Sequence, residues 1–136
     1  MHKYSFEKLE VWNLAKGFVK EIHLVTKTFP SDERFGLVSQ INRAAVSVAS
    51  TLAEGTSRAS QKDQSHFSNI AYGSLMEVAC QLIISFELGY ITDKQHDQLR
   101  KAVEVISNKL NALRNYQLGR VPQFRLNNST SQRLNK

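Results

Sequence analysis

The chain has 136 residues, of which 41% are hydrophobic, and 18 Lys or Arg against 12 Asp or Glu give it a formal net charge of +6. This length suits one domain that buries a core without disulfides or metal, and the single cysteine, Cys80, excludes an internal disulfide. The sequence shows no positively charged and then apolar leader of the secretory kind, so we expect a cytoplasmic protein. Its uninterrupted apolar runs fall far short of the ~20 residues of a membrane-spanning helix, so we expect no membrane segment.

Apolar residues recur three and four positions apart and β-branched alternation is absent, which predicts an all-α protein. The first predicted helix begins near Ser5, a candidate cap, and ends at Pro30. Its apolar face comprises Leu9, Trp12, Phe18 or Val19, Ile22, Val25 and Phe29. The second predicted helix follows a turn-rich link and ends or loosens at Gly55, and its apolar face comprises Leu37, Ile41, Ala44 or Ala45, Val48 and Leu52.

Two capping boxes predict the starts of the third and fourth helices, Ser60 with Asp63 and Thr92 with Gln95. The third apolar face comprises Phe67, Ile70 or Ala71, Ser74 or Leu75, Val78, Leu82 and Phe86, before a stop at Gly89. The fourth comprises Leu99, Val103, Ile106, Leu110, Leu113 and Gln117, before Gly119. Short links between helices of comparable length favour an antiparallel up-down-up-down four-helix bundle over residues 1–119, with a flexible basic tail over 120–136.

Positive charge is concentrated at the carboxyl end. Residues 1–104 contain twelve Lys or Arg and twelve Asp or Glu, whereas residues 105–136 contain six Lys or Arg and no acid. A neutral body with a cationic last helix and tail is an electrostatic footprint for a polyanion, and nucleic acid is the commonest such partner. The alternative is a solvated helix face followed by a disordered tail that lacks acids, and charge does not separate the two.

Polar side chains follow one flank of the second predicted helix, at positions three, four and seven apart: Gln40, Arg43, Ser47 and Glu54. On the third predicted helix, Gly73 and Ser74 are small enough for another helix to come close, and Glu77 lies among core positions and needs a partner such as Arg43. These residues form either an internal network that fixes helix pairing or a functional site.

Motifs spread over the chain resemble, taken together, the four-helix-bundle proteins encoded in intervening sequences of bacterial 23S ribosomal RNA genes. The matching segments are FEKLEVW at 6–12, FP at 29–30, ERFGL at 33–37, SQINRAAVS at 39–47, AEG at 53–55, IAYGSLME at 70–77 and LGYI at 88–91. The resemblance covers roughly residues 4–118. Thr51-Leu52 stands where the family usually has Asn-Ile, so any role of that Asn amide is absent or taken by the Thr hydroxyl.

This resemblance implies an antiparallel four-helix bundle that assembles as a ring, a homopentamer, without established catalysis. The family is also similar to the accessory protein of diversity-generating retroelements, a basic pentameric barrel that engages nucleic acid and a reverse transcriptase. The present chain shares the basic balance, with a pI near 9.6. The partners to expect are therefore further copies of the chain, RNA or DNA, and a protein such as a reverse transcriptase.

Enzymatic alternatives have little support in the sequence. A di-iron bundle needs Glu-x-x-His on two helices, and the nearest matches, Asp63-x-x-His66 and Asp93-x-x-His96, start consecutive antiparallel helices and so lie at opposite ends. We expect both histidines to be solvated. Cys80, between Val78 and Leu82, is expected to be a buried structural thiol, and no glycine-rich phosphate loop occurs. We therefore expect no catalysis, no metal and no cofactor.

Two hypotheses of function remain. The first is a non-enzymatic, nucleic-acid-binding oligomer whose basic surface is built by Lys109, Arg114, Arg120 and Arg125. The second is a protein–protein interaction scaffold without nucleic-acid binding. In the second, the contact surface or subunit interface is the flank of Gln40, Arg43, Glu54 and Arg58. The full polar set is then either an interface or a structural polar network, and it comprises Gln40, Arg43, Ser47, Glu54, Arg58, Ser74 and Glu77.

Overall fold

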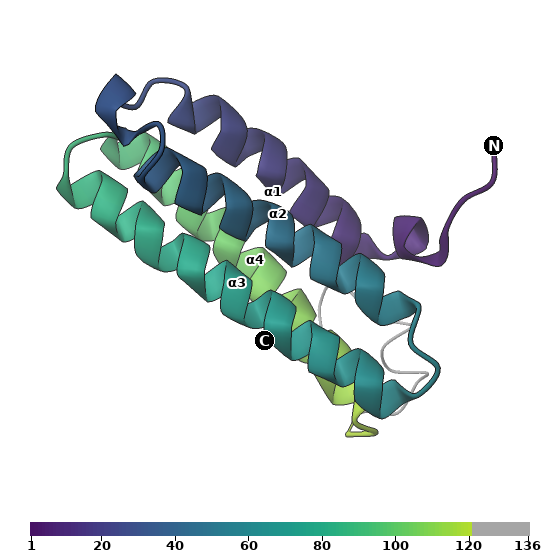
Figure 1. Ribbon diagram of the computed structural model, residues 1–136. Coiled ribbons are helices and arrows are strands. Elements are labelled where there is room, and N and C mark those ends of the chain that lie inside the picture. The colour runs from purple at the N-terminus through teal and green to yellow at the C-terminus, as the bar shows by residue number, and fades with distance from the viewer. Residues whose placement is uncertain (121–136) are drawn as a thin grey trace.

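The computed structural model describes residues 1–120 and shows a bundle of four antiparallel α-helices (Figure 1). The helices are α1 (Glu10–Thr26), α2 (Leu37–Thr56), α3 (Gln61–Glu87) and α4 (Asp93–Gln117). Short 3₁₀ helices precede two of them, η1 (Ser5–Lys8) before α1 and η2 (Ser31–Glu33) before α2. No strand occurs in the described part, which confirms the predicted all-α bundle, while the predicted tail lies outside it from residue 121 onward.

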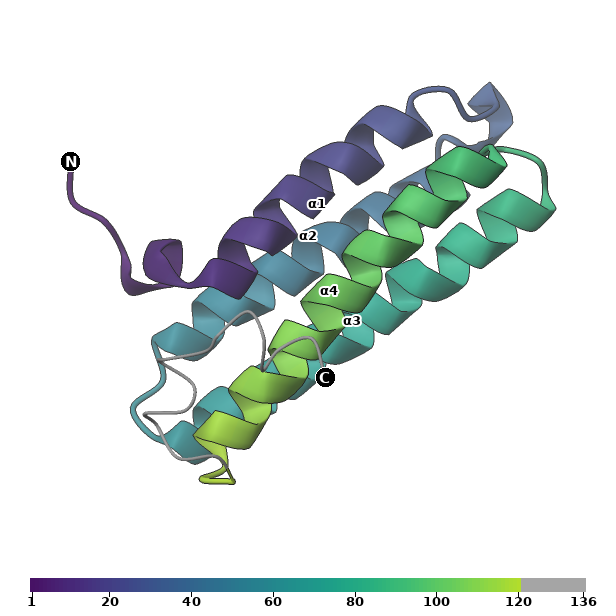
Figure 2. The same cartoon turned by 180° about the vertical axis from the view of Figure 1, so that it is seen from behind.

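The helices pack in chain order around one core. Figures 1 and 2 show α2 beside α1 and α3, with α4 behind in Figure 1 and in front in Figure 2, so that α1 and α3 are diagonal to each other. The closest packing is between α2 and α3, followed by α3 with α4, and the sparsest is between α1 and α4. One end of the bundle therefore holds the amino ends of α1 and α3 together with the carboxyl ends of α2 and α4.

Both predicted caps are present. The Ser60 hydroxyl accepts a hydrogen bond from the Asp63 amide at 3.1 Å. Thr92 and Gln95 cap each other reciprocally, at 3.1 Å to the Thr92 hydroxyl and 2.9 Å to the Gln95 side-chain oxygen. These bonds satisfy amide groups that the first turn of a helix leaves without partners.

The first helix is shorter than predicted and begins later. Leu9 has extended backbone angles, φ −85° and ψ 120°, which separate η1 from α1. The Asn13 side-chain amide stabilises this break by donating to the carbonyl groups of Glu7 (2.9 Å) and Leu9 (3.1 Å). At the other end α1 stops at Thr26, whose hydroxyl donates to the Ile22 carbonyl at 2.9 Å. Side-chain bonds to the backbone compete with the helix here, a signal that apolar periodicity does not carry.

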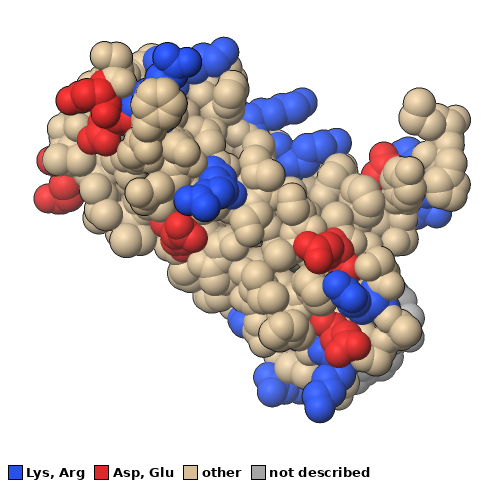
Figure 3. All heavy atoms as spheres, in the orientation of Figure 1, with Lys and Arg blue, Asp and Glu red and all other residues tan. Residues whose placement is uncertain are grey.

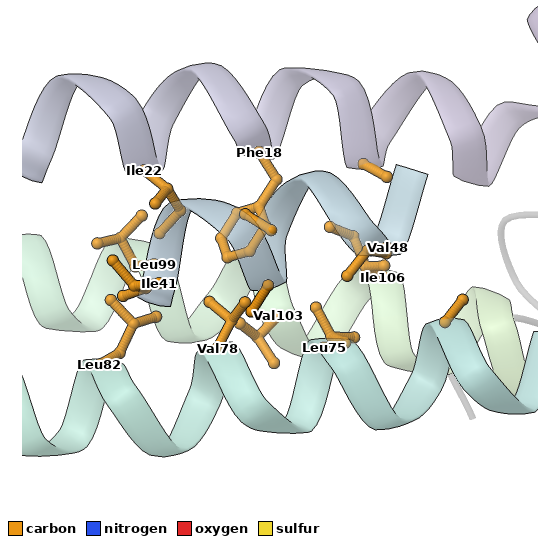
Figure 4. Packing of buried hydrophobic residues seen from close by; sticks show 14 of the residues in the cluster. Phe18, Ile22, Ile41, Val48, Leu75, Val78, Leu82, Leu99, Val103 and Ile106 are labelled. Carbon is orange, nitrogen blue, oxygen red and sulfur yellow. The ribbon is translucent and has the colours of Figure 1, made fainter. Parts of the chain in front are cut away.

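All four helices contribute to the core (Figure 4). Its largest fully buried apolar side chains are Phe18, Ile22, Ile41, Val48, Leu75, Val78, Leu82, Leu99, Ile106 and Leu110. The predicted stripes are confirmed, and where the periodicity left a choice, Phe18, Ala71 and Leu75 are the buried members. Each fully buried side chain of the Leu, Ile or Phe type contributes about 1.5–3 kcal/mol, so this core supplies most of the driving force for folding.

Gly55 of α2 packs closely against Phe67 of α3. A Cβ atom at this position would lie 3.0 Å from the Cβ of Phe67 and 3.6 Å from the Gln64 carbonyl oxygen. The 3.6 Å distance is an ordinary contact, but at 3.0 Å the Phe67 side chain would have to shift by a few tenths of an ångström, so the glycine favours close packing of the two helices here.

α3 is apolar on more than its core side. By length and composition it could span a membrane, since an 18-residue window reaches a mean hydropathy of 1.2, yet only 33% of that window is buried inside the bundle. The expectation of no such segment came from uninterrupted runs, and α3 passes this test because Ser, Gly and Gln interrupt the runs without lowering the average much. The core helix of a soluble protein passes the same test. The consequence is an apolar surface on the outside of the bundle.

Candidate functional site

The outward side of α2 and α3 forms the first candidate surface, here called the α2–α3 face. It carries the predicted polar set, with Gln40, Arg43, Glu54, Arg58 and Glu77 exposed and Ser47 and Ser74 half-buried. The two serine hydroxyls lie 2.9 Å apart and are hydrogen-bonded across the helix pair. Seven residues chosen from sequence are thus gathered on one side of the molecule.

These residues do not form an internal salt-bridge network. Glu77 is exposed and accepts a hydrogen bond from the Gln81 side chain at 3.3 Å, and within residues 1–120 no ion pair joins it to Arg43. Glu54 and Arg58 make a loose pair at 3.7 Å with both side chains about half exposed. Glu77 lies on the outward side of α3, so the prediction that placed it among core positions was wrong.

Apolar and small side chains fill the α3 part of the α2–α3 face. Ile70, Met76 and Ile84 are 37–43% exposed, and Gly73 between them has nothing within 4 Å of where a Cβ would lie. Cys80 is also exposed here, which corrects the expectation of a buried thiol. Figure 3 shows this side of the molecule as mostly uncharged, with separated charges of both signs.

Two of the four cations predicted to bind nucleic acid are engaged within the protein. Lys109 is 5% exposed and its Nζ lies 3.1 Å from Glu10 Oε1, so its assignment to a binding surface was wrong. Arg114 is half-buried, donates to Asn69 Oδ1 at 2.6 Å and to Asn111 Oδ1, and lies 4.4 Å from the centre of the Tyr72 ring. The ammonium group of Lys109 thus links α4 to α1, and the guanidinium group of Arg114 links α4 to α3.

The other two predicted cations lie at or beyond the end of α4. Arg120 is exposed and makes a long hydrogen bond to Asn115 Oδ1, at 3.5 Å. Arg125 lies outside the described residues. The described part of the carboxyl end therefore offers less free positive charge than the sequence indicated.

The two predicted helix-start histidines differ. His66 is exposed as expected, but His96 is buried and stacks on Phe86 with ring centroids 4.5 Å apart. The expectation of a solvated His96 was wrong because it lies one turn before Leu99, on the same buried stripe. Across residues 1–120, no three His, Cys, Asp or Glu side chains come together as metal ligands.

α1 carries a second surface that the sequence reasoning missed. Lys16, Lys20 and Lys27 are all exposed and follow one stripe, here called the α1 ridge. Figure 3 shows Lys and Arg side chains projecting along the α1 edge of the molecule. The spacing of four and seven was visible in the sequence, but the neutral total of residues 1–104 concealed it.

Comparison with known families gives one match. The model of the family described as 23S rRNA-intervening sequence protein matches residues 7–112. The chain belongs to this family. In this member of the 23S rRNA-intervening sequence protein family, the matched region runs from η1 into α4 and so includes both the α2–α3 face and the α1 ridge. No curated protein matches the chain.

Proposed function

We propose that the protein is a non-enzymatic, cytoplasmic oligomer that assembles through the α2–α3 face and binds nucleic acid with cations outside that face. The observation that carries the proposal is the exposure of Ile70, Met76 and Ile84 around Gly73, in a helix whose core side is already satisfied. Contiguous exposed apolar side chains rimmed by polar ones are typical of protein interaction sites.

A second copy of the chain is the occupant that the α2–α3 face suits best. The α2–α3 face carries Arg43 together with Glu54 and Glu77, so it offers both signs of charge to a second copy of the chain. Gly73, Ser47 and Ser74 permit close approach of another helix backbone. Family resemblance favours a pentameric ring, in which each subunit uses two different patches rather than one shared patch.

Light scattering coupled to size exclusion tests the assembly. We expect the wild-type protein at micromolar concentration to have a mass several times the 15.4 kDa of one chain, five times for the ring. Ile84→Asp places a charge in the proposed interface and should give monomers with unchanged helicity. Val105→Asp is the matched control, because Val105 is similarly exposed, at 38%, but lies on α4. A wild-type monomer contradicts the proposal.

Nucleic-acid binding is supported by the net charge of +6, which assembly multiplies by the number of subunits. The test is retention of labelled RNA and DNA at ~50 mM salt and its loss as salt rises, because phosphate contacts release counterions. The engagement of Lys109 and Arg114 within the protein favours the alternative, an interaction scaffold without nucleic acid. Absence of binding at ~50 mM salt would select that alternative.

A further inference from the structure

Positive and negative charges occupy different flanks of α1. Lys16, Lys20 and Lys27 are four and seven positions apart, which places them on one stripe at steps of roughly 6 and 10 Å along the axis. His23, also exposed, lies on the same stripe. The α1 ridge therefore presents a line of positive charge along most of the helix.

The acids of α1 face the other way. Glu10 pairs with Lys109 of α4, and Glu21 lines a groove together with Gln95 and Leu99 of α4. Among residues 1–120 no ion pair neutralises a lysine of the α1 ridge. Lys94, Arg100 and Lys101 of α4 lie among Asp93, Asp97 and Glu104, whereas no acid of α1 shares the stripe of the α1 ridge.

Aromatic rings continue the ridge at its amino end. The Tyr4 and Phe6 rings are stacked, with centroids 5.6 Å apart and planes 3° from parallel, and Phe6 meets Trp12 edge to face at 4.9 Å. Lys16 Nζ then lies 5.0 Å from the centre of the Trp12 ring. Tyr4 is 61% exposed, so its ring is open to a ligand. Rings and lysines thus form one continuous track over η1 and α1.

We propose that this track binds single-stranded nucleic acid, with bases stacking on the aromatic rings at η1 and phosphates lying along the α1 ridge. The inference rests on the proposed nucleic-acid function and deepens it by naming the surface and the strand type. Stacking platforms beside a line of cations recognise unpaired strands, since a duplex hides the faces of its bases. The track lies on η1 and α1, apart from the outward side of α3 that we propose for assembly.

Two triple variants of equal charge test the lysines. K16Q/K20Q/K27Q removes the α1 ridge, and K94Q/R100Q/K101Q removes three exposed cations of α4 that alternate with Asp93, Asp97 and Glu104. Fluorescence anisotropy with labelled oligo(U) and oligo(dT) at graded salt is the readout. We expect the ridge variant to lose about ten-fold or more in affinity at ~50 mM salt and to flatten the slope of log affinity against log salt by about 2, the value for three phosphates of a single strand. The α4 variant should change the slope by less than about 1.

The aromatic part has its own test. Trp12 is the single tryptophan, so its fluorescence reports directly on the track. We expect quenching by oligo(U) or oligo(dT) and little by a duplex of equal length, and a loss of at least about five-fold in single-strand affinity for Tyr4→Ala, without a matching loss for the duplex. Tighter binding of oligo(U) or of oligo(dT) identifies RNA or DNA as the natural strand.

The outcomes separate the inference from the proposed function. If wild-type protein binds neither strand type at ~50 mM salt, the proposed nucleic-acid function fails. If it binds but the two triple variants lose affinity equally, or if Tyr4→Ala affects the duplex as much as the single strand, this inference is overturned while the proposed function stands. Circular dichroism of each variant controls for folding, and every substituted side chain is exposed.

Discussion

The ammonium group of Lys109 lies 3.1 Å from a carboxylate oxygen of Glu10, joining the first turn of α1 to α4. Lys109 is 5% exposed and Glu10 about half exposed, so the lysine depends on this partner more than the glutamate does. The pair lies where packing is sparsest, between α1 and α4. It therefore fixes a helix contact that apolar side chains cover less completely.

Glu10→Gln should destabilise the protein by about 1–3 kcal/mol, because it leaves a buried ammonium group without a counter-charge. Lys109→Met keeps the packing and leaves Glu10 to solvent, so it should change the free energy of unfolding by less than about 1 kcal/mol. Urea unfolding followed by circular dichroism measures both. Equal losses of stability in the two variants would contradict the asymmetry.

Sequence periodicity was sufficient for the core and for the caps of α3 and α4, because both depend on residues within a few positions of each other. It failed for Lys109, whose partner comes from the other end of the chain. It failed for Cys80 because a residue two positions from Val78 and from Leu82 is turned about 200° from each of them, away from the core. The α1 ridge was missed because acids elsewhere cancelled its charge in the total.

Adjacent residues of α4 test the buried stripe. Ile106 is 1% exposed and Val105 is 38% exposed. Ile106→Asp should cost several kcal/mol and unfold or dissociate the protein, because an unpaired carboxylate in the core has no solvent. Val105→Asp should change stability by no more than about 0.5 kcal/mol. Thermal melts of both variants test this prediction. A similar unfolding midpoint for the two would show that Ile106 does not face the core.

The Tyr90 hydroxyl donates a 2.8 Å hydrogen bond to Glu33, linking the α3–α4 connection to η2. That bond, then burial and the charges of Glu33 and Asp32, raises the pKa of Tyr90 above its ordinary value of 10.0. A raised pKa in the folded state means that the bond stabilises the protein fully below pH 10 and that this contribution is lost as pH rises above it. Tyr90→Phe should therefore lower Tm at pH 7, and its difference from wild type should shrink above about pH 10.

The comparison with Tyr90→Phe cancels the pH effects of every other group, because wild type and variant share them all. Differential scanning calorimetry between pH 7 and 11 gives the two Tm values at each pH. A difference in Tm that stays constant over the whole range would show that the hydroxyl does not titrate with folding.

Truncation after Gly119 separates the bundle from the cationic carboxyl end. It removes no acid but four cations, Arg120, Arg125, Arg133 and Lys136. It leaves α4 whole, because that helix ends at Gln117. Gly119 has the left-handed φ of 72° that is typical of a residue just after a helix end. We expect Tm and oligomer mass to be retained. Affinity for nucleic acid should fall less than in the K16Q/K20Q/K27Q variant, and the salt slope should flatten by about 0.7 for each phosphate of a single strand that the truncated protein no longer neutralises. If truncation abolishes binding while the ridge variant binds normally, the carboxyl end rather than α1 neutralises the phosphates.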